Sequence, residues 1–235
     1  KKLKKNEEFI NFKKIITSDG SPTLYSININ EYYKSKHGAL TESNYVFLNN
    51  GLDFWKKKNN KSKCRIFEMG FGLGFNAYST LVSNSIKNMK IEYDTIEAFP
   101  VEFEVIKSLN FDNYSNNIID LNLFLKLHSI PWGLKVNFNS SFNIFKIKSK
   151  IENYNFVNKY DVIFYDAFGY RVQPELWKVS TLEPLLKSLN SNGVFVTYSS
   201  KGSVKRILES KGFSVKKIKG PPGKREMLKA YKRKV

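Results

Sequence analysis

Three glycines spaced two residues apart stand between a short apolar run and a segment that can begin a helix. The apolar run covers 64–67, the helical segment covers 77–82, and the glycines are Gly70, Gly72 and Gly74. Backbone can approach a ligand closely at a strand, a glycine turn and a helix N-terminus, because glycine adds no side chain and the helix end offers free N–H groups. The segment therefore predicts a ligand-binding turn, with a glycine-rich turn of any α/β domain as the alternative.

The spacing of these glycines narrows the class of ligand. The dinucleotide fingerprint is G-x-G-x-x-G, whereas 70–74 reads G-x-G-x-G, with Glu68 two residues ahead. This form suits a cofactor that has no pyrophosphate and carries a positively charged amino-acid tail. S-adenosylmethionine is the candidate, since the Glu68 carboxylate at the strand end can meet its ammonium group or a bridging water.

A second acid closes the next expected strand. Residues 91–97 predict a strand that ends in Glu97. An acid about 20 residues past a glycine turn is placed to accept hydrogen bonds from both ribose hydroxyls of an adenosine cofactor. Glu97 is therefore the candidate for the ribose contact, and a carboxylate on a solvated strand end is the alternative.

A third acid, Asp166, follows 160–165, the clearest strand of the chain. Ligands of a parallel α/β sheet bind beyond the carboxyl ends of its strands, so Asp166 should face the same crevice as the first two acids. A carboxylate there can hold an amine and take its proton as a methyl group arrives. Phe168 or Tyr170 could stack on a base. A capping aspartate on a loop is the alternative.

The charge of the chain points to a polyanionic partner. Lysine and arginine number 39 against 21 acidic residues, a net charge of +18. Biased coding would exchange arginine for lysine but would not remove acids, so the excess favours a partner such as nucleic acid. A membrane surface is disfavoured, because no basic amphipathic helix stands out.

Basic residues crowd the last twenty positions, where Glu226 is the one acid. Such clustering suits phosphate contacts, whereas a merely solvated face would mix charges of both signs. The residues expected to contact the substrate's phosphates are Lys216, Lys217, Lys219, Lys224 and Arg225, with Arg206 on the preceding helix.

Length and composition exclude several classes of protein. The 235 residues favour one catalytic domain with an appended segment, and no apolar run approaches the roughly 18 residues of a membrane span. The single cysteine, Cys64, excludes a disulfide framework, and His37 and His128 lie too far apart for a metal-ligand spacing. We expect a cytoplasmic protein without a metal site.

Expected strands alternate with expected helices from residue 63 onward, which predicts an α/β fold with a doubly wound parallel sheet. Further strands are expected at 134–138, 194–198, 213–218 and 227–231, the last two as an antiparallel pair. Helices are expected at 101–109, 120–127, 179–189 and 202–211. Residues 1–60, with helical patterning at 31–36 and 40–55, are expected to form an extension that covers the site of the domain at 61–235.

Several motifs together resemble the methyltransferase domain of MnmC, the bifunctional enzyme of the tRNA wobble uridine. They are GFGLGFN at 70–76, EAFP at 97–100, DAF at 166–168, PELW at 174–177 and GKREML at 223–228, with DGSP at 19–22 and ESNYVFL at 42–48 in the extension. The resemblance covers nearly the whole chain. It implies a Rossmann-like class I S-adenosylmethionine-dependent methyltransferase that converts 5-aminomethyl-2-thiouridine in tRNA to its 5-methylaminomethyl form. It also places Asn76 with the glycine turn at the cofactor.

Two departures from the family matter. The family usually has Gly-Asp near the adenine, where this chain has Asn139 and Ser140, so adenine recognition is expected to fall to Ser140, Ser141 or backbone groups. The family's fused FAD-dependent oxidase is also missing from this sequence. The aminomethyl substrate is then expected to come from another route, unless the substrate has changed.

Two other interpretations stay open. One is a methyltransferase or aminopropyl-transfer enzyme for a small amine, against which the basic C-terminal segment argues. The other is an RNA-binding module without catalysis, suggested by the missing aspartate near the adenine. Cofactor binding would separate the second interpretation from both enzymes.

Overall fold

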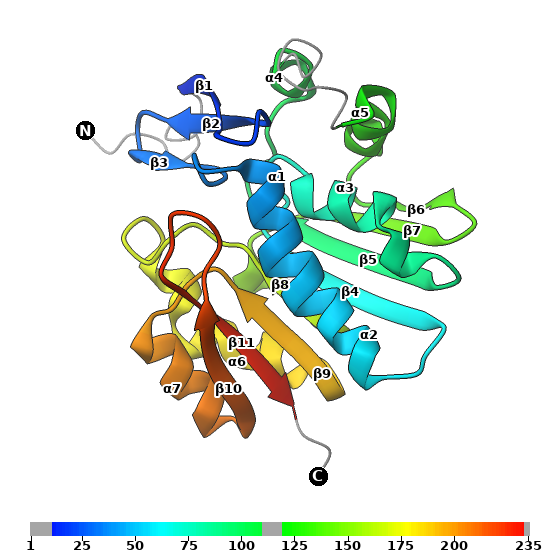
Figure 1. Cartoon of the computed structure of the whole chain (residues 1–235), viewed down its shortest axis with the longest axis vertical. Helices are drawn as coiled ribbons and strands as arrows, with labels where there is room; N and C mark the ends of the chain where they lie inside the picture. The colour runs from blue at the N-terminus through cyan, green and yellow to red at the C-terminus, as the bar shows by residue number, and fades with distance from the viewer. Residues whose placement is uncertain (1–10, 110–118, 233–235) are drawn as a thin grey trace.

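The central feature of the computed structural model, which describes residues 11–109 and 119–232, is an eight-stranded sheet (Figure 1). Its strand order is β10-β11-β9-β8-β4-β5-β7-β6. The strands are β4 (Lys63–Met69), β5 (Lys90–Glu97), β6 (Lys135–Asn139), β7 (Phe142–Lys148), β8 (Tyr160–Tyr165), β9 (Leu189–Thr197), β10 (Phe213–Lys219) and β11 (Glu226–Lys232). The five inner strands β7, β5, β4, β8 and β9 pair in parallel, and the outer strands pair antiparallel.

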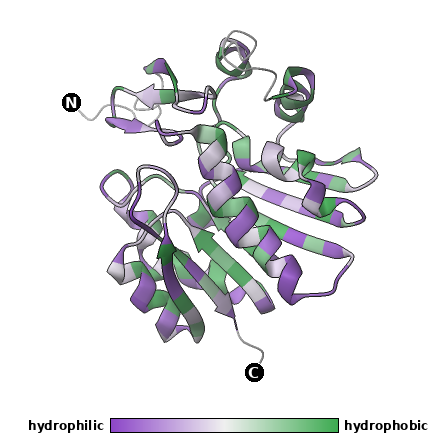
Figure 2. Cartoon of the chain, in the orientation of Figure 1, coloured by the Kyte–Doolittle hydropathy of each residue, from purple (hydrophilic) through white to green (hydrophobic). Residues whose placement is uncertain are grey.

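Helices cover both faces of this sheet, so the inner strands are apolar on both sides, as parallel strands usually are. All six residues of β8 are buried. One core cluster joins one face to α3, α5 and the N-terminal helix, and the other joins the opposite face to α6 and α7. In Figure 2, green predominates in the second half of β9, whereas α7 carries both purple and green residues, as a helix with one buried face does. The helices are α3 (Phe75–Val82), α4 (Phe103–Lys107), α5 (Leu121–Ser129), α6 (Val179–Lys187) and α7 (Gly202–Ser210), with short 3-10 turns η3 (Asn84–Ile86), η5 (Ile151–Asn153) and η6 (Pro174–Trp177).

The N-terminal segment forms a small sheet followed by a long helix. The sheet contains β1 (Phe12–Ile16), β2 (Pro22–Ser26) and β3 (Glu31–Tyr32), and the helix runs through α1 (Ala39–Glu42), η2 (Ser43–Asp53) and α2 (Phe54–Lys58). The helix packs on the central sheet, where the Phe47 and Phe164 rings lie 5.4 Å apart. The helix predicted at 40–55 is confirmed, and it shares the core of the sheet.

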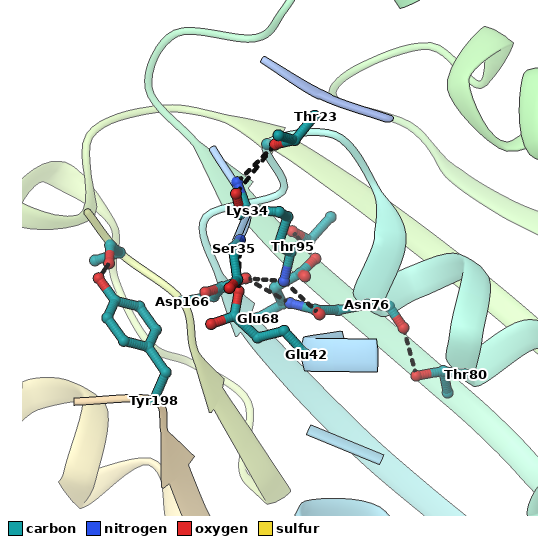
Figure 3. Close-up of polar contacts among 12 residues, drawn as sticks. Thr23, Lys34, Ser35, Glu42, Glu68, Asn76, Thr80, Thr95, Asp166 and Tyr198 are labelled. Carbon is teal, nitrogen blue, oxygen red and sulfur yellow. Dashed lines mark hydrogen bonds and ion pairs between the residues drawn. The ribbon is translucent and has the colours of Figure 1, made fainter. Parts of the chain in front are cut away.

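The helical patterning at 31–36 is a wrong prediction, because this segment pairs with β2 instead. Tyr32 lies opposite Tyr25 in the sheet. The backbone N–H of Lys34 donates to Thr23 Oγ1 at 3.0 Å. Pairing with a strand already in place supplies these hydrogen bonds, so tertiary contact overrides the local helical pattern. As a result, the side chain of Lys34 points toward the ends of the central strands (Figure 3).

The strand expected at 134–138 is confirmed, but it does not take the place of the third parallel strand. It forms β6, an antiparallel edge strand, and the third parallel strand is β7, which the sequence analysis missed. Its sequence FNIFKIK mixes apolar residues with Asn143, Lys146 and Lys148, so it lacks the continuous apolar run of a buried parallel strand. The turn between β6 and β7 therefore holds Ser140 and Ser141, and the carbonyl of Ser141 accepts a hydrogen bond from Ile91 at the start of β5.

The remaining predicted elements are confirmed, including the antiparallel pair β10–β11 and the Rossmann-like sheet. Within the described ranges, no helix combines the length and apolar character that a membrane crossing requires.

Candidate functional site

A cavity of about 1020 Å³ lies beyond the carboxyl ends of β4, β5, β8 and β9. Two predicted acids, Glu97 and Asp166, line it together with the glycine turn. Residues of the N-terminal segment, including Tyr33 and Lys34, close the opposite wall. The sheet thus brings together strand ends that are far apart in the sequence, as predicted, and the extension contributes directly to the cavity.

The glycine turn needs glycine for its conformation and for close packing. Gly70, Gly72 and Gly74 have φ angles of 89°, 51° and 72°, in the left-handed region. A Cβ atom on Gly70 would stand 2.7 Å from the backbone oxygen of Asp166. Gly70 and Gly72 line the cavity, whereas Gly74 caps the start of α3.

Glu68 lies beneath the turn instead of in the cavity. Its side chain is fully buried, and Thr95 Oγ1 donates to its Oε2 at 2.7 Å. Burial raises the pKa of Glu68 to about 8, so the carboxyl is largely neutral at pH 7. Glu68 is not among the residues that line the cavity, so its contact with a cofactor ammonium, directly or through a water, stays a prediction.

Glu68→Gln should raise the free energy of unfolding at pH 7 by up to about 3 kcal/mol. The unfolded carboxyl loses its proton near its ordinary pKa of 4.5, but the folded one keeps it up to about 8. Between these values the folded state binds more protons, so stability falls as the pH rises. The neutral amide of the variant would remove this fall. Urea unfolding of both proteins from pH 5 to pH 8 measures it; curves that stay parallel at every pH would contradict it.

Glu97 holds the glycine turn and presents its carboxylate to the cavity. Its Oε2 accepts from the N–H of Gly72 at 3.1 Å, and its Oε1 accepts from the N–H of Phe99 at 3.1 Å. Burial raises the pKa of Glu97, and the backbone donors oppose that shift. Each carboxylate oxygen has a second lone pair. Glu97 can therefore accept ribose hydroxyls while it holds the turn.

Asp166 is part of a buried cluster with Lys34 and Asn76 (Figure 3). Lys34 Nζ lies 2.5 Å from Asp166 Oδ2 and donates to Asn76 Oδ1 at 2.8 Å, while Asn76 Nδ2 donates to the same Oδ2 at 2.8 Å. The side chains of Lys34 and Asp166 are only 4% and 8% exposed. Asn76 thus binds the same carboxylate oxygen of Asp166 that Lys34 contacts. The sequence analysis missed Lys34, which no motif or spacing sets apart from the other lysines.

Charges around this cluster alternate in sign. Burial raises the pKa of Asp166, and the ammonium group of Lys34 opposes the shift. Although burial also acts on Glu42, Lys224 and Lys34 together hold the pKa of Glu42 below its usual range. Lys224 Nζ lies 3.1 Å from Glu42 Oε1 and 3.4 Å from the centre of the Tyr198 ring. Lys224 is therefore a paired residue of the cavity wall.

The two predicted aromatic contacts differ in position. Phe168 lines the cavity, and its ring lies 5.0 Å from that of Tyr33 at an interplanar angle of 80°. The Tyr170 side chain is 44% exposed, and the ammonium of Lys201 lies over its ring outside the residues that line the cavity. Phe168 is thus the one of the two that lines the cavity, and its stacking on a base stays a prediction.

The predicted basic patch follows an edge of the sheet. Lys216, Lys217 and Lys219 are exposed on the edge strand β10. Arg225 in the hairpin turn and Arg206 on α7 are also exposed. The hairpin continues from this edge to the cavity through Lys224.

Ser140 and Ser141 are not at the cavity. They precede β7, which runs parallel to β5, so they lie at the amino-terminal edge, roughly 20 Å from the carboxyl ends at about 3.3 Å per residue. This position is at odds with the predicted adenine contact. The residues that follow β7 and line the cavity are Lys150, Ile151 and Glu152.

Two further features concern the single cysteine and the possible metal ligands. Cys64 is buried in β4, and burial raises the pKa of its thiol. In the part of the chain that the structure describes, no three His, Cys, Asp and Glu side chains gather as a metal site would need.

Sequence comparison identifies the relatives of this chain. Residues 133–233 match the model of a family described as S-adenosyl-L-methionine-dependent methyltransferase. The tRNA 5-methylaminomethyl-2-thiouridine biosynthesis bifunctional protein MnmC of Burkholderia multivorans is 26% identical over 218 residues, covering 88% of this chain and 33% of that protein. The MnmC of Campylobacter jejuni strain RM1221 is 28% identical over 229 residues, covering 93% and 36%. The chain thus spans about a third of the length of these relatives.

Structural comparison gives the same result. The crystal structure of MNMC2 from Aquifex aeolicus superimposes with a TM-score of 0.71 and 25% identity, covering 94% of this chain and 70% of that one. These similarities confirm the predicted resemblance, the class I methyltransferase fold and S-adenosyl-L-methionine as the cofactor.

Proposed function

We propose that this S-adenosyl-L-methionine-dependent methyltransferase methylates the amino group of 5-aminomethyl-(2-thio)uridine at the wobble position of tRNA. One observation carries the proposal: Asp166 lies in the same cavity as the glycine turn and Glu97, in a chain similar to MnmC over nearly all its length. The name of those relatives includes tRNA and 5-methylaminomethyl-2-thiouridine.

The residues of the cavity fit this cofactor. Glu97 offers a carboxylate to the ribose hydroxyls, and the backbone at Gly70 and Gly72 approaches the cavity without side chains. Ile151 supplies apolar surface near the expected adenine position. When bound, S-adenosyl-L-methionine supplies an electrophilic methyl group.

Asp166 is the proposed base for the amine. An alkyl ammonium has no lone pair, so it must lose a proton before it can accept a methyl group. Lys34 and Asn76 both use Oδ2 of Asp166, which leaves Oδ1 to bind the amine and to take its proton. Phe168 would stack on the uracil and hold the amine in line with the methyl group, because catalysis of this kind depends largely on positioning.

Nucleoside analysis tests this function. The protein is incubated with labelled S-adenosyl-L-methionine and with bulk tRNA that carries aminomethyl wobble uridines, and the digested tRNA is separated into nucleosides. We expect the label in 5-methylaminomethyl-(2-thio)uridine alone. Label in another nucleoside, or none in tRNA although the cofactor binds, would refute the proposal.

Glu97→Ala should weaken binding of S-adenosyl-L-methionine by about 1–3 kcal/mol, because the ribose hydroxyls and the N–H of Gly72 lose an acceptor. Glu97→Gln, which retains one acceptor oxygen, should lose less. Titration calorimetry with the two variants measures both effects. Unchanged affinity in a folded Glu97→Ala protein would remove Glu97 from the ribose contact.

The affinity for tRNA should fall steeply with salt, because phosphate neutralisation releases counterions. Replacing Lys216, Lys217 and Lys219 by Ala should flatten the slope of log Kd against log salt concentration by up to about 2–3. Filter binding over a salt series measures the slope. The matched control replaces three exposed lysines at the amino-terminal edge of the sheet, Lys63, Lys87 and Lys90. Equal slopes for both triple variants would place the tRNA contacts elsewhere.

A further inference from the structure

A second cavity, of about 410 Å³, lies on the other side of the glycine turn. Phe71 and Gly72 line both cavities, so one residue layer separates them. The loop after β5, the segment after α5 and strand β7 form its walls. None of the residues predicted from the sequence except Gly72 lies there, and the proposed methyl transfer leaves this cavity without a role.

A buried ammonium group lies between the aromatic walls of this cavity. Lys146 is 1% exposed, and its Nζ lies 5.1 Å from the centre of the Phe71 ring and 4.8 Å from that of Trp132. Nζ donates to the backbone oxygen of His128 at 2.9 Å. Within the described residues, no carboxylate lies within 4.0 Å of it, as the ion pairs show.

A buried cation without a carboxylate partner is costly, since burial in low dielectric penalises the charged form. Burial accordingly lowers the pKa of Lys146 to about 8. The neighbouring His128 cannot share the charge, because burial lowers its pKa to about 3 and leaves it neutral. An anion that entered the cavity would supply the missing counter-charge and the acceptors for the remaining N–H groups.

The other lining residues fit an anion that carries an aromatic ring. Lys148, two residues further along β7, is exposed at the rim and adds a second positive charge. Phe103 is 37% exposed and Trp132 is half-buried, so both offer ring faces for stacking. Glu102 is the acid among the lining residues, and its side chain is exposed to solvent.

We propose that this second cavity binds a nucleotide, with its phosphate at Lys146 and Lys148 and its base against Phe103 and Trp132. The nucleotide belongs to the RNA substrate and is not a free mononucleotide. A chain that places one nucleotide in the first cavity can place a neighbouring nucleotide across the shared wall of Phe71 and Gly72. The choice of source rests on the proposed function, whereas the nucleotide chemistry of the cavity does not.

Tryptophan fluorescence gives a direct readout of this cavity. Trp55 and Trp177 are 1% and 2% exposed, so Trp132 is the tryptophan that a ligand in the cavity can reach. Uridine 5′-monophosphate should quench the fluorescence in a saturable manner, and uridine without phosphate should bind more weakly. Trp132→Phe should abolish the signal. Titrations repeated with S-adenosylhomocysteine present should give the same result, because the cofactor occupies the other cavity.

Lysine variants then assign the phosphate contact and its source. Lys146→Met and Lys148→Met should each weaken binding of uridine 5′-monophosphate by about tenfold or more, and both should weaken tRNA binding. Lys126→Met is the matched control, since Lys126 is an exposed lysine on α5 outside the cavity. Binding of S-adenosylhomocysteine, measured by calorimetry, checks that each variant is folded.

Each outcome decides a separate part of the proposal. Absence of saturable quenching by uridine 5′-monophosphate, or equal affinity in the Lys146→Met, Lys148→Met and control proteins, would overturn the nucleotide site. Weaker binding of the mononucleotide with unchanged tRNA affinity would overturn RNA as the source and identify a free nucleotide. Saturable quenching that responds to both lysine variants would support the site even if the protein failed to methylate tRNA.

Discussion

Asp166→Asn should reduce the turnover of methyl transfer by roughly 10²–10⁴-fold, the range expected for loss of a positioned general base. The amide side chain of this variant keeps the shape of the aspartate, and its carbonyl oxygen can still accept from Lys34 and Asn76. It has neither the negative charge nor the basicity to take a proton from an amine. Cofactor affinity should change much less, because the proposed cofactor contacts are made by Glu97 and the glycine turn and not by Asp166. Single-turnover methylation of tRNA, with calorimetry for the cofactor, measures the two effects.

A matched aspartate lies at the other end of the same strand. Asp161 is the second residue of β8, accepts from the backbone N–H of Arg65 at 2.9 Å and lies outside the cavity. Asp161→Asn therefore also removes a largely buried carboxylate. Its turnover, expressed per amount of folded protein, should be nearly unchanged. If Asp166→Asn methylates tRNA at close to the parent rate from about pH 6 to about pH 9, Asp166 is not the base and the amine must arrive neutral.

The sequence predicts much of this site because its chemistry lies at strand ends. A buried strand followed by glycines or an acid is a local pattern, and parallel pairing brings the carboxyl ends of such strands to one edge. Glu97 and Asp166 were found in this way, and both line the cavity. The confirmed fold follows from the same alternation of strands and helices.

The burial of a side chain, and contacts between residues far apart in the sequence, cannot be predicted from such local patterns. Lys34 meets Asp166 across 132 positions of the chain, and it belongs to a segment whose local pattern is helical. Glu68 carries the expected residue type at the expected position, but its full burial raises its pKa to about 8. Strand β7 was missed because Lys146 interrupts its apolar pattern, and the aromatic cavity that receives this lysine forms only in the folded chain.

Lys34→Met should lower turnover at neutral pH by about 10²-fold, with recovery as the pH rises. Burial already raises the pKa of Asp166, and Lys34 provides the charge that opposes it. Without that charge the pKa of Asp166 rises further, so its carboxylate form prevails only at more alkaline pH. Asp166→Asn should show no such recovery. A pH–rate profile of both variants therefore distinguishes a positioning residue from the base itself.

The same substitution should also lower the free energy of unfolding by about 3–5 kcal/mol, because it leaves a buried carboxylate without its partner. Lys13→Met is the control, since Lys13 is exposed on β1 of the same small sheet. Thermal unfolding and the pH–rate profile are measured on all three proteins. A loss of turnover that is equal at every pH would assign Lys34 a purely structural role. An unchanged profile in stable protein would show that Asp166 keeps its ionisation without Lys34.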